Sequence, residues 1–556
     1  MLAFLLLTGW LQEVASAPSP VGAAAHVLLR EESVMVEPSG RQTTMTRGVI
    51  RILTPAGARY ARAGVVYDSA NGQLVEFRAW VQSPAGQPQE IDAEEFVDRN
   101  YSQGELRSPL RQRQIEAAVA PGSLLIYQST VVAHSVFPQV EFEFQETELP
   151  VLRSRFLLTA PATWDIRPVA FAASPIRSGN TWEVRVLPAR PNTFPRLAVT
   201  LLPRNTDLPS FATWPDVAQW LGDRAESAAQ PTPLVASQAA KVTAGLGTDR
   251  QRIQALGAFV QRLRYVAINE NLGQGGGFTP AAADTVLSRG YGDCKDKATL
   301  LRALLRAVNI NSWLVAINAT DRSRARPEWP SPRVFNHAIV AIETESGLIY
   351  FDPSDPHSTL GALPSALQGA PALVLRAGAT LAVTPEQPGE IERKITVYLE
   401  QDGRVTGRLL EASRGSAAAE TRARFSSGSY DSVVSGWLDA QLTKLTVKDE
   451  FPQEGVHLYA QFDKENRLAL AGELYIWKPL LPWGPHRGAV SVHETFEIEL
   501  HPRWMVEEMP EPVRTSSFSA AWFLRDGKLI IDRQLRTQPG SVIPVEHLPI
   551  VLRRLH

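Results

Sequence analysis

The sequence predicts a multidomain chain in which one α+β domain lies between two mostly-β domains of the sandwich type. The chain has 556 residues, and at about 150 residues per domain this length suggests three or four domains. Segments that alternate apolar and polar residues, as half-buried strands do, dominate both ends of the chain. Amphipathic helical segments gather in the middle and precede a group of strands, an order that is typical of an α+β domain.

The composition narrows the class of protein. Hydrophobic residues make up 44% of the chain and charged residues 21%, near the average for soluble globular proteins. Because the formal net charge is only −2, we expect no nucleic acid as a partner. The sequence contains one cysteine, Cys294, so intrachain disulfides and multi-cysteine metal sites are excluded.

The first residues of the sequence predict export. An apolar run from Leu2 to Leu11 is followed by Ala15-Ser16-Ala17, the small-x-small pattern of a secretory cleavage site. The run is too short to span a bilayer stably. We therefore expect residues 1–17 to be a signal peptide, with a buried or anchoring segment as the alternative. The processed protein is then expected to be soluble and either periplasmic or secreted.

Residues 24–205 are predicted to form the first mostly-β domain. The segment Gln73–Gln82 alternates apolar and polar residues, and Pro and Gly residues separate it from similar segments. The other expected strands include Val27–Val36, Thr43–Leu53, Leu124–Val132, Val140–Gln145, Phe156–Thr159 and Trp182–Leu187. Within this region only Glu94–Glu116 has a pattern of comparable length that suggests a helix.

The middle and C-terminal domains are predicted over residues 230–385 and 391–556. A helix is expected to start at Trp214, ahead of the middle domain. Further helices are expected at Leu234–Leu246, Asp249–Leu263 and Asp293–Asn309, and strands at Ser312–Asn318, Phe335–Thr344 and Leu348–Asp352. The C-terminal domain is β-rich, with one amphipathic helix expected at Tyr430–Leu445.

The lone cysteine lies where a helix is expected to begin. Asp293 precedes it as a good N-cap, and Asp296, three residues later, suggests a capping box. Cys294 then falls in the first helical turn, where the backbone amides and the helix dipole favour a thiolate. Lys295 and Lys297 are expected to add to this positive field. A lone cysteine is usually a small buried hydrophobic residue, but this position favours a nucleophile.

A nucleophilic thiolate needs a base, and the base needs an acceptor that orients it. His337 lies in one expected strand, and Asp352 ends the next strand along the chain. If these strands pair antiparallel about the turn at 345–347, both side chains lie on one face and within reach of each other. A histidine in a strand is more often structural. Two nearby residues could also replace a member of the set, Asp355 and His357.

The three motifs resemble those of a known family. They are Tyr-Gly-Asp-Cys-Lys-Asp-Lys-Ala at 291–298, Asn-His-Ala at 336–338 and Phe-Asp-Pro at 351–353. In this order they are similar to the motifs of the transglutaminase-like cysteine enzyme superfamily. The resemblance covers about residues 230–385 and implies a papain-related α+β core, with a catalytic triad of Cys294, His337 and Asp352. The flanking β regions resemble those of bacterial exported members, in which the first is a domain of unknown function.

The resemblance also implies a reaction. The Cys294 thiolate would attack a peptide or carboxamide carbonyl of a protein or peptide substrate and form a thioester. Water resolves that thioester in a hydrolase, and an amine resolves it in an acyltransferase. The Cys294 backbone amide would hold the oxyanion together with a second donor. No cofactor or metal is expected, because the acidic loop of known spacing that would indicate calcium is missing from this sequence.

A second class of function stays open at this point. In the alternative the chain is a catalytically idle scaffold, whose two β domains bind a protein or a glycan. The intact set of Cys294, His337 and Asp352 favours the enzyme. Substrate specificity is expected to depend on loops such as Ala319–Arg333.

Overall fold

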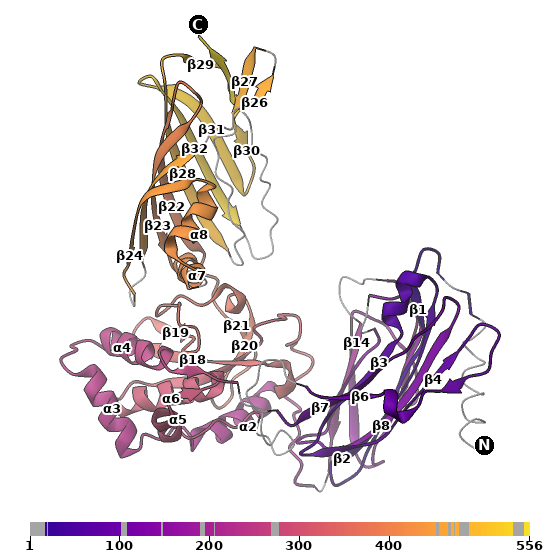
Figure 1. The fold of residues 1–556 in the computed structure, drawn as a ribbon. Helices are drawn as coiled ribbons and strands as arrows, with labels where there is room; N and C mark the ends of the chain where they lie inside the picture. Colours follow the sequence, from indigo (N-terminus) through magenta and orange to yellow (C-terminus); the bar gives the residue numbers. More distant parts are fainter. Residues whose placement is uncertain are drawn as a thin grey trace.

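A computed structural model gives the fold of the chain (Figure 1). It describes residues 17–18, 20–101, 108–145, 148–189, 195–204, 206–267, 277–426, 428–451, 455–464, 469–471, 473–477, 489–537 and 550–555. The expected signal peptide lies outside the described residues, apart from Ala17. A β region (indigo to purple), an α+β core (magenta to pink) and a second β region (orange to yellow) follow one another along the chain.

The N-terminal β region is built on an eight-stranded sheet with the order β12-β13-β10-β1-β2-β8-β4-β5. Its strands are β1 (Ala25–Val36), β2 (Arg41–Ile52), β4 (Gly72–Gln82), β5 (Gln89–Glu90), β8 (Leu124–His134), β10 (Val151–Thr159), β12 (Ile176–Ser178) and β13 (Thr181–Leu187). Neighbouring strands are antiparallel, except that β1 runs parallel to β10.

Two smaller sheets accompany this one. The first has the order β11-β14-β9 and contains β9 (Gln139–Glu143), β11 (Asp165–Phe171) and β14 (Arg196–Leu202). The second has the order β3-β7-β6 and contains β3 (Arg62–Asp68), β6 (Val97–Asn100) and β7 (Leu110–Glu116). A 3₁₀ turn at Pro55–Tyr60 connects β2 to β3.

The core of this region lies between two of these sheets. Phe156 of the eight-stranded sheet stacks on Phe142 of β9 at a centroid distance of 5.3 Å, and Trp182 and Val199 belong to the same buried cluster. This packing confirms the predicted sandwich.

The prediction of a helix at Glu94–Glu116 is wrong. A 3₁₀ turn and strands β6 and β7 occupy the described part of that segment, because β7 pairs with β3 along its whole length and such pairing overrides a local pattern.

The core places most of its helices before an antiparallel sheet, as predicted. The helices are α2 (Trp214–Glu226), α3 (Pro233–Thr243), α4 (Asp249–Gln261), α5 (Ala283–Arg289) and α6 (Cys294–Ala307). The sheet has the order β19-β18-β17-β20-β21, with β17 (Ser312–Ile317), β18 (His337–Thr344), β19 (Gly347–Phe351), β20 (Pro371–Val374) and β21 (Ala382–Val383). Short 3₁₀ turns lie at Pro332–Val334 and Ser365–Leu367.

Helix α6 is the centre of this core. Its leucines at 300, 301, 304 and 305 are fully buried and pack against α3, α4, α5 and the sheet. Burying a leucine side chain stabilises a fold by about 1.5–3 kcal/mol, so this row fixes α6 on the sheet. The same row therefore fixes the position of the residue that begins α6, Cys294.

The C-terminal region has an eight-stranded sheet with the order β24-β25-β23-β22-β28-β32-β31-β30. Its strands are β22 (Gly389–Leu399), β23 (Val405–Arg414), β24 (Gln441–Asp449), β25 (Val456–Lys464), β28 (Val490–Leu500), β30 (Val513–Arg514), β31 (Phe518–Arg525) and β32 (Lys528–Thr537). A second sheet, β26-β27-β33-β29, contains β26 (Ala469–Ala471), β27 (Leu474–Trp477), β29 (Trp504–Glu508) and β33 (Ile550–Arg554).

Two helices differ from the prediction for this region. The helix expected at Tyr430–Leu445 is half as long, because α8 (Tyr430–Leu438) ends where Asp439 takes a left-handed conformation with φ 48°. The rest of that segment is β24, which pairs with β25. Helix α7 (Ser416–Phe425) was not predicted. It lies at the end of the C-terminal region that faces the core (Figure 1).

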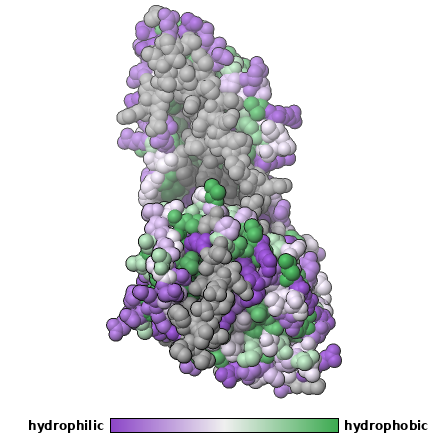
Figure 2. Space-filling model, turned by 90° about the vertical axis from the view of Figure 1, so that its right-hand side faces the viewer, coloured by the Kyte–Doolittle hydropathy of each residue, from purple (hydrophilic) through white to green (hydrophobic). Residues whose placement is uncertain are grey.

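The surface carries a mixture of side chains. On the face shown in Figure 2, hydrophilic and hydrophobic residues alternate in small groups over the described part of the chain. No helix among the described residues is both long enough and apolar enough to cross a membrane.

Candidate active site

Cys294 is the first residue of α6, and Asp293 is the N-cap. The Asp293 carboxylate accepts a hydrogen bond from the Asp296 amide at 3.1 Å. The predicted capping box is wrong in its second half, since the Asp296 carboxylate turns instead to the Ala281 amide, at 2.8 Å, and to Arg289. The helix thus begins at the predicted residue, and the second carboxylate anchors the segment before α5.

The two lysines of the motif have different surroundings. Lys295 forms an ion pair with Asp293, and its positive charge also interacts with Cys294. Lys297 is buried, and its ammonium donates to the carbonyl oxygens of Gln261 at 3.2 Å and Leu263 at 2.9 Å. Burial lowers the pKa of Lys297 to about 8, although nearby carboxylates oppose that shift. Lys297 therefore fixes the C-terminal end of α4, a role that the sequence did not indicate.

His337 begins β18, and Asp352 follows the last residue of β19. The strands pair antiparallel with Val340 opposite Phe351, so continuing that register places Asp352 one diagonal step from His337. The Nε2 atom of His337 lies 2.8 Å from the Oδ2 atom of Asp352. The structure therefore brings together the two residues that strand alternation placed on one face.

The mutual attraction of the two charges favours an imidazolium beside a carboxylate, against the effect of burial. Burial alone would lower the pKa of His337, but the charge and hydrogen bond of Asp352, together with contact to Cys294, raise it well above the usual value. Burial alone would raise the pKa of Asp352, but His337 and two hydrogen bonds from Ser354 lower it. Cys294 is close enough to His337 to contribute to this raised pKa. The three predicted residues thus lie together, with His337 between the thiol and the Asp352 carboxylate.

Tyr265 is a fourth polar residue at the sulfur. It lies in β15 (Arg264–Tyr265), which pairs parallel with β16 (Tyr291–Gly292) directly before Asp293. The Tyr265 hydroxyl lies beside Cys294, and both residues line the same cavity. Burial raises the pKa of Tyr265, and the neighbouring Cys294 and Asp293 raise it further, so the hydroxyl keeps its proton. Sequence analysis missed this residue, because a two-residue strand leaves no periodic signal.

Cys294, His337 and Tyr265 line a cavity of about 580 Å³, which we call the thiol cavity. The rest of its wall combines polar residues, namely Asp293, Lys295 and Asn336, with apolar ones that include Leu221, Phe278, Pro280, Phe335 and Leu375. Sites that bind small ligands have volumes of about 300–1,000 Å³. The thiol cavity is therefore large enough for a substrate group attached to the sulfur.

The N-terminal region contacts the wall of the thiol cavity. Phe137, in the connection between β8 and β9, packs against Phe278 with ring centroids 5.8 Å apart.

The loop Ala319–Arg333, in which specificity was predicted, is also fixed by this region. Arg324 pairs with Glu141 at 3.2 Å and Glu143 at 3.3 Å, and the Gln139 amide donates to the Pro330 carbonyl at 2.8 Å. The first β region thus supports the segment that leads to His337.

The alternative members of the triad have other roles in the structure. Asp355 accepts hydrogen bonds from the His357 amide and the Ser358 hydroxyl, so it stabilises its own turn. Asp352 is the carboxylate that pairs with His337.

Within the described part of the chain, no group of three His, Cys, Asp or Glu side chains is arranged to hold a metal ion.

Comparison with protein families and solved structures gives matches to the core and to the first β region. Residues 236–353 match the model of the transglutaminase-like superfamily, and residues 38–191 match DUF3857, a domain of unknown function. A “putative protease” from Parabacteroides distasonis has a similar structure at 12% identity, with a TM-score of 0.64 over 95% of this chain and 99% of that chain. At that identity the likeness shows a shared fold, and it extends over all three parts of the chain.

Two further comparisons add little. A “putative cysteine protease” from Cytophaga hutchinsonii is 12% identical over 56% of this chain and 76% of that chain, with a TM-score of 0.17. A score this low supports no argument about the fold. The search of curated proteins gives no match.

Proposed function

We propose that this chain, which carries a transglutaminase-like core behind a DUF3857 domain, is an exported cysteine-dependent enzyme. It attacks a peptide or carboxamide carbonyl and forms a thioester. The observation that supports this proposal is the set of Cys294 at a helix N-terminus, His337 next to it, and the buried Asp352 carboxylate that is hydrogen-bonded to His337. A scaffold without activity would not need this arrangement.

In the first step the Cys294 thiolate attacks the carbonyl carbon, and the carbonyl oxygen becomes an oxyanion. Because the pKa of His337 is raised, the imidazole carries a proton at neutral pH and donates it to the leaving nitrogen. The C–N bond then breaks and the thioester remains on Cys294. Asp352 holds the ring in place and stabilises its positive charge, as the orienting acid of a triad does.

The oxyanion is held by two donors in this proposal. One is the backbone N–H of Cys294, at the start of α6. The other is the Tyr265 hydroxyl, which lies beside Cys294 and keeps its proton. Fixed donors at the developing charge are commonly the largest single contribution to such catalysis.

In the second step His337 accepts a proton from water or from an amine, which attacks the thioester carbon. The C–S bond breaks, and the acyl group leaves as an acid or as a new amide. Phe278 and Phe335, in the apolar part of the wall of the thiol cavity, favour an acyl group with an apolar side chain.

A p-nitrophenyl ester tests the proposed nucleophile. Acylation of Cys294 by p-nitrophenyl acetate releases one p-nitrophenolate per molecule in a rapid burst, ahead of slow turnover. The burst should be absent from Cys294→Ser and present in a control that replaces an exposed serine, such as Ser346→Ala. If wild type and Cys294→Ser release p-nitrophenolate alike, the enzyme proposal is wrong and the scaffold becomes the better explanation.

Export is the second part of the proposal, and it is supported by the apolar run that ends in Ala15-Ser16-Ala17. Cleavage after Ala17 should leave Pro18 as the first residue. N-terminal sequencing of protein from a secreting host checks this. An intact Met1 on protein that stays in the cytosol would contradict it.

A further inference from the structure

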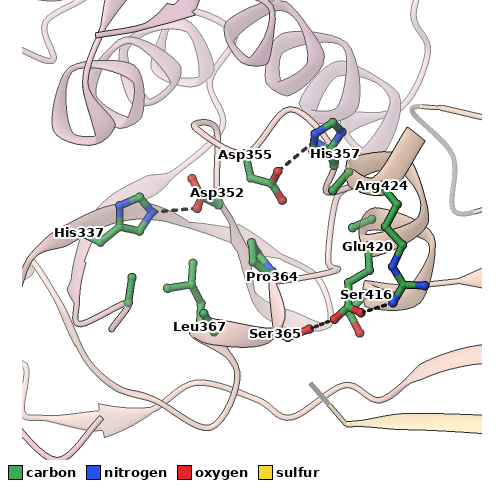
Figure 3. A pocket seen from close by; sticks show the side chains of 14 residues that line it. His337, Asp352, Asp355, His357, Pro364, Ser365, Leu367, Ser416, Glu420 and Arg424 are labelled. Atoms are coloured by element: carbon green, nitrogen blue, oxygen red, sulfur yellow. Dashed lines mark hydrogen bonds and ion pairs between the residues drawn. The ribbon is translucent and has the colours of Figure 1, made fainter. Parts of the chain in front are cut away.

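The carboxylate of the proposed triad lies on a loop that extends to the C-terminal region. This loop, residues 352–358, follows β19. It supplies Asp352, Asp355 and His357 to the wall of a second cavity, of about 640 Å³, which His337 and residues of α7 also line. Figure 3 shows Asp352 beside His337 at one end of the loop, and His357 at the other end, next to α7. The loop therefore joins the catalytic pair to the C-terminal region.

The loop determines how the Asp352 carboxylate is oriented. The Oδ1 atom of Asp352 accepts hydrogen bonds from the Ser354 amide at 2.8 Å and from the Ser354 hydroxyl at 2.7 Å. The Oδ2 atom is then the one that faces Nε2 of His337, at 2.8 Å. Because a shift of Ser354 would turn the carboxylate, the pairing of Asp352 with His337 depends on where the loop lies.

Side chains from two regions of the molecule hold the far end of the loop. The Gln261 amide, at the end of α4, donates to the carbonyl oxygens of Asp355 and Ser358, both at 2.7 Å. The Arg422 guanidinium, in α7, donates to the carbonyl oxygen of His357 at 3.1 Å. These three carbonyls belong to the turn that the Asp355 carboxylate stabilises. The core and the C-terminal region thus fix the same turn.

Arg422 is suited to this role because its own position is fixed. The residue is buried, and its guanidinium pairs with Asp449, the last residue of β24, at 2.9 Å. It also donates to the carbonyl oxygen of Gly455, directly before β25, at 3.2 Å. The planar fork of arginine can serve these acceptors and His357 together, and hydrogen bonds from a charged donor are about twice as strong as neutral ones. One side chain therefore connects the C-terminal sheet to the loop of Asp352.

We propose that Arg422 is a positioning residue of the catalytic site, through which the C-terminal region holds the loop 352–358 where Asp352 can pair with His337. This inference rests on the proposed cysteine mechanism. Arg422 does not take part in the chemistry itself, because it acts through the His357 carbonyl and the loop. The C-terminal region then contributes to catalysis as well as to the fold.

The ratio of two alkylation rates tests this inference. Iodoacetamide reacts with the Cys294 thiolate, which at pH 6.5 is favoured by the His337 imidazolium that Asp352 stabilises. At about pH 10 a cysteine is ionised without such help. The rate at pH 6.5 divided by the rate at pH 10 therefore reports the pairing of Asp352 with His337. A general loss of access to the thiol lowers both rates and leaves the ratio unchanged.

Arg422→Met should lower this ratio about two- to tenfold, the factor that corresponds to the net contribution of one hydrogen bond. The matched control is Ser365→Ala, which removes another contact between the core and α7, the hydrogen bond to Glu420 at 2.8 Å, and should keep the wild-type ratio. If Arg422→Met does not fold, Arg422→Gln, which can still bond to Asp449, takes its place with the same expected result.

A double variant shows whether Arg422 acts through Asp352. Adding Arg422→Met to Asp352→Asn should lower the ratio no further, because the charge that favours the imidazolium is already gone. A further decrease in the double variant overturns the inference, since Arg422 would then act on the thiol by another route.

The remaining outcomes separate this inference from the proposed function. A wild-type ratio in the Arg422 variant, or an equal decrease in Ser365→Ala, overturns the inference alone, because Arg422 would then only join two regions. If His337→Ala keeps the wild-type ratio, the proposed function is wrong, and this inference is wrong with it.

Discussion

Two regions of the molecule bury opposite charges, and they differ in what surrounds the charges. In the core, His337 and Asp352 form a pair that contacts Cys294 and lies between two cavities. In the C-terminal sheet, a row of buried charges crosses four neighbouring strands, with Glu411, Arg393, Glu494 and Arg533 in that order. None of these four residues lines either cavity.

The difference shows that buried charge alone does not indicate a catalytic site. Each charge in the C-terminal row is paired with an opposite charge on the next strand, so the row stabilises the sheet itself. The pair in the core has a third partner, the thiol, and its imidazole lines two cavities. We therefore expect substitutions in the core pair to change reactivity, and substitutions in the row to change stability.

The largest effect should come from the members of the core set. Cys294→Ala and His337→Ala should each lower the rate of acyl transfer by up to about 10⁶, as removal of triad members does in other enzymes. The double variant should be no slower than either single variant, because residues that act as a unit are not additive. Steady-state kinetics on an activated ester measure this. Losses that multiply in the double variant would contradict a common role.

The row in the C-terminal sheet should show the opposite behaviour. Glu494→Gln leaves Arg393 and Arg533 without a shared buried counter-ion, and breaking a buried ion pair costs about 3–5 kcal/mol of stability. Urea unfolding measures this loss. The matched control is Glu507→Gln, which alters the exposed pair with Arg553 and should change stability little. The burst per folded molecule should be normal in both variants. If folded Glu494→Gln gave no p-nitrophenolate burst, the row would affect reactivity as well as stability, and the two regions would not differ in this respect.

Tyr265→Phe tests whether the Tyr265 hydroxyl holds the oxyanion. The variant removes one proposed oxyanion donor, so acylation by the ester should slow by about 10²–10³. Alkylation of Cys294 by iodoacetamide forms no oxyanion and should change little. Equal losses in both reactions would show that Tyr265 only positions the thiol.

The pH dependence of the acylation rate should shift in Asp352→Asn. The pKa of His337 is raised mainly by Asp352, against burial that lowers it. In wild type the acylation rate should fall only as pH rises through this raised pKa, because the proton for the leaving group is then lost. In Asp352→Asn burial acts without the carboxylate, so the alkaline fall should shift to lower pH. Rate profiles between neutral and alkaline pH measure the shift. Identical profiles would mean that Asp352 does not set the protonation of His337.

The sequence allowed the main parts of the site to be predicted because their signals are local. Asp293 is a helix cap directly before Cys294, and strand alternation placed His337 and Asp352 on one face. Tyr265 could not be predicted in this way, since it reaches Cys294 through a two-residue parallel pairing between segments far apart in the chain. Contacts of this kind depend on tertiary packing.

Features of the fold that depend on tertiary packing could not be predicted from the sequence either. The order of β, α+β and β regions follows from periodicity and is confirmed, but the helix expected at Tyr430–Leu445 was too long. Its second half alternates well enough to pair as β24, and Asp439 breaks the helix by taking a left-handed conformation. Helix α7 has a signal that could have been used, because Ala417, Ala418 and Ala419 are strong helix formers. Its position beside His337 depends on packing between regions and has no local signal.

The central claim is that the imidazole of His337 acts on the Cys294 thiol. The most direct test is the rate at which iodoacetamide alkylates Cys294 at pH 6.5 in wild type, in His337→Ala and in the control Glu507→Gln. Because a neighbouring imidazolium favours the thiolate, wild type and the control should react at least about tenfold faster than His337→Ala. Equal rates in all three proteins would contradict the claim, since the buried pair of His337 and Asp352 would then be structural, like the row in the C-terminal sheet.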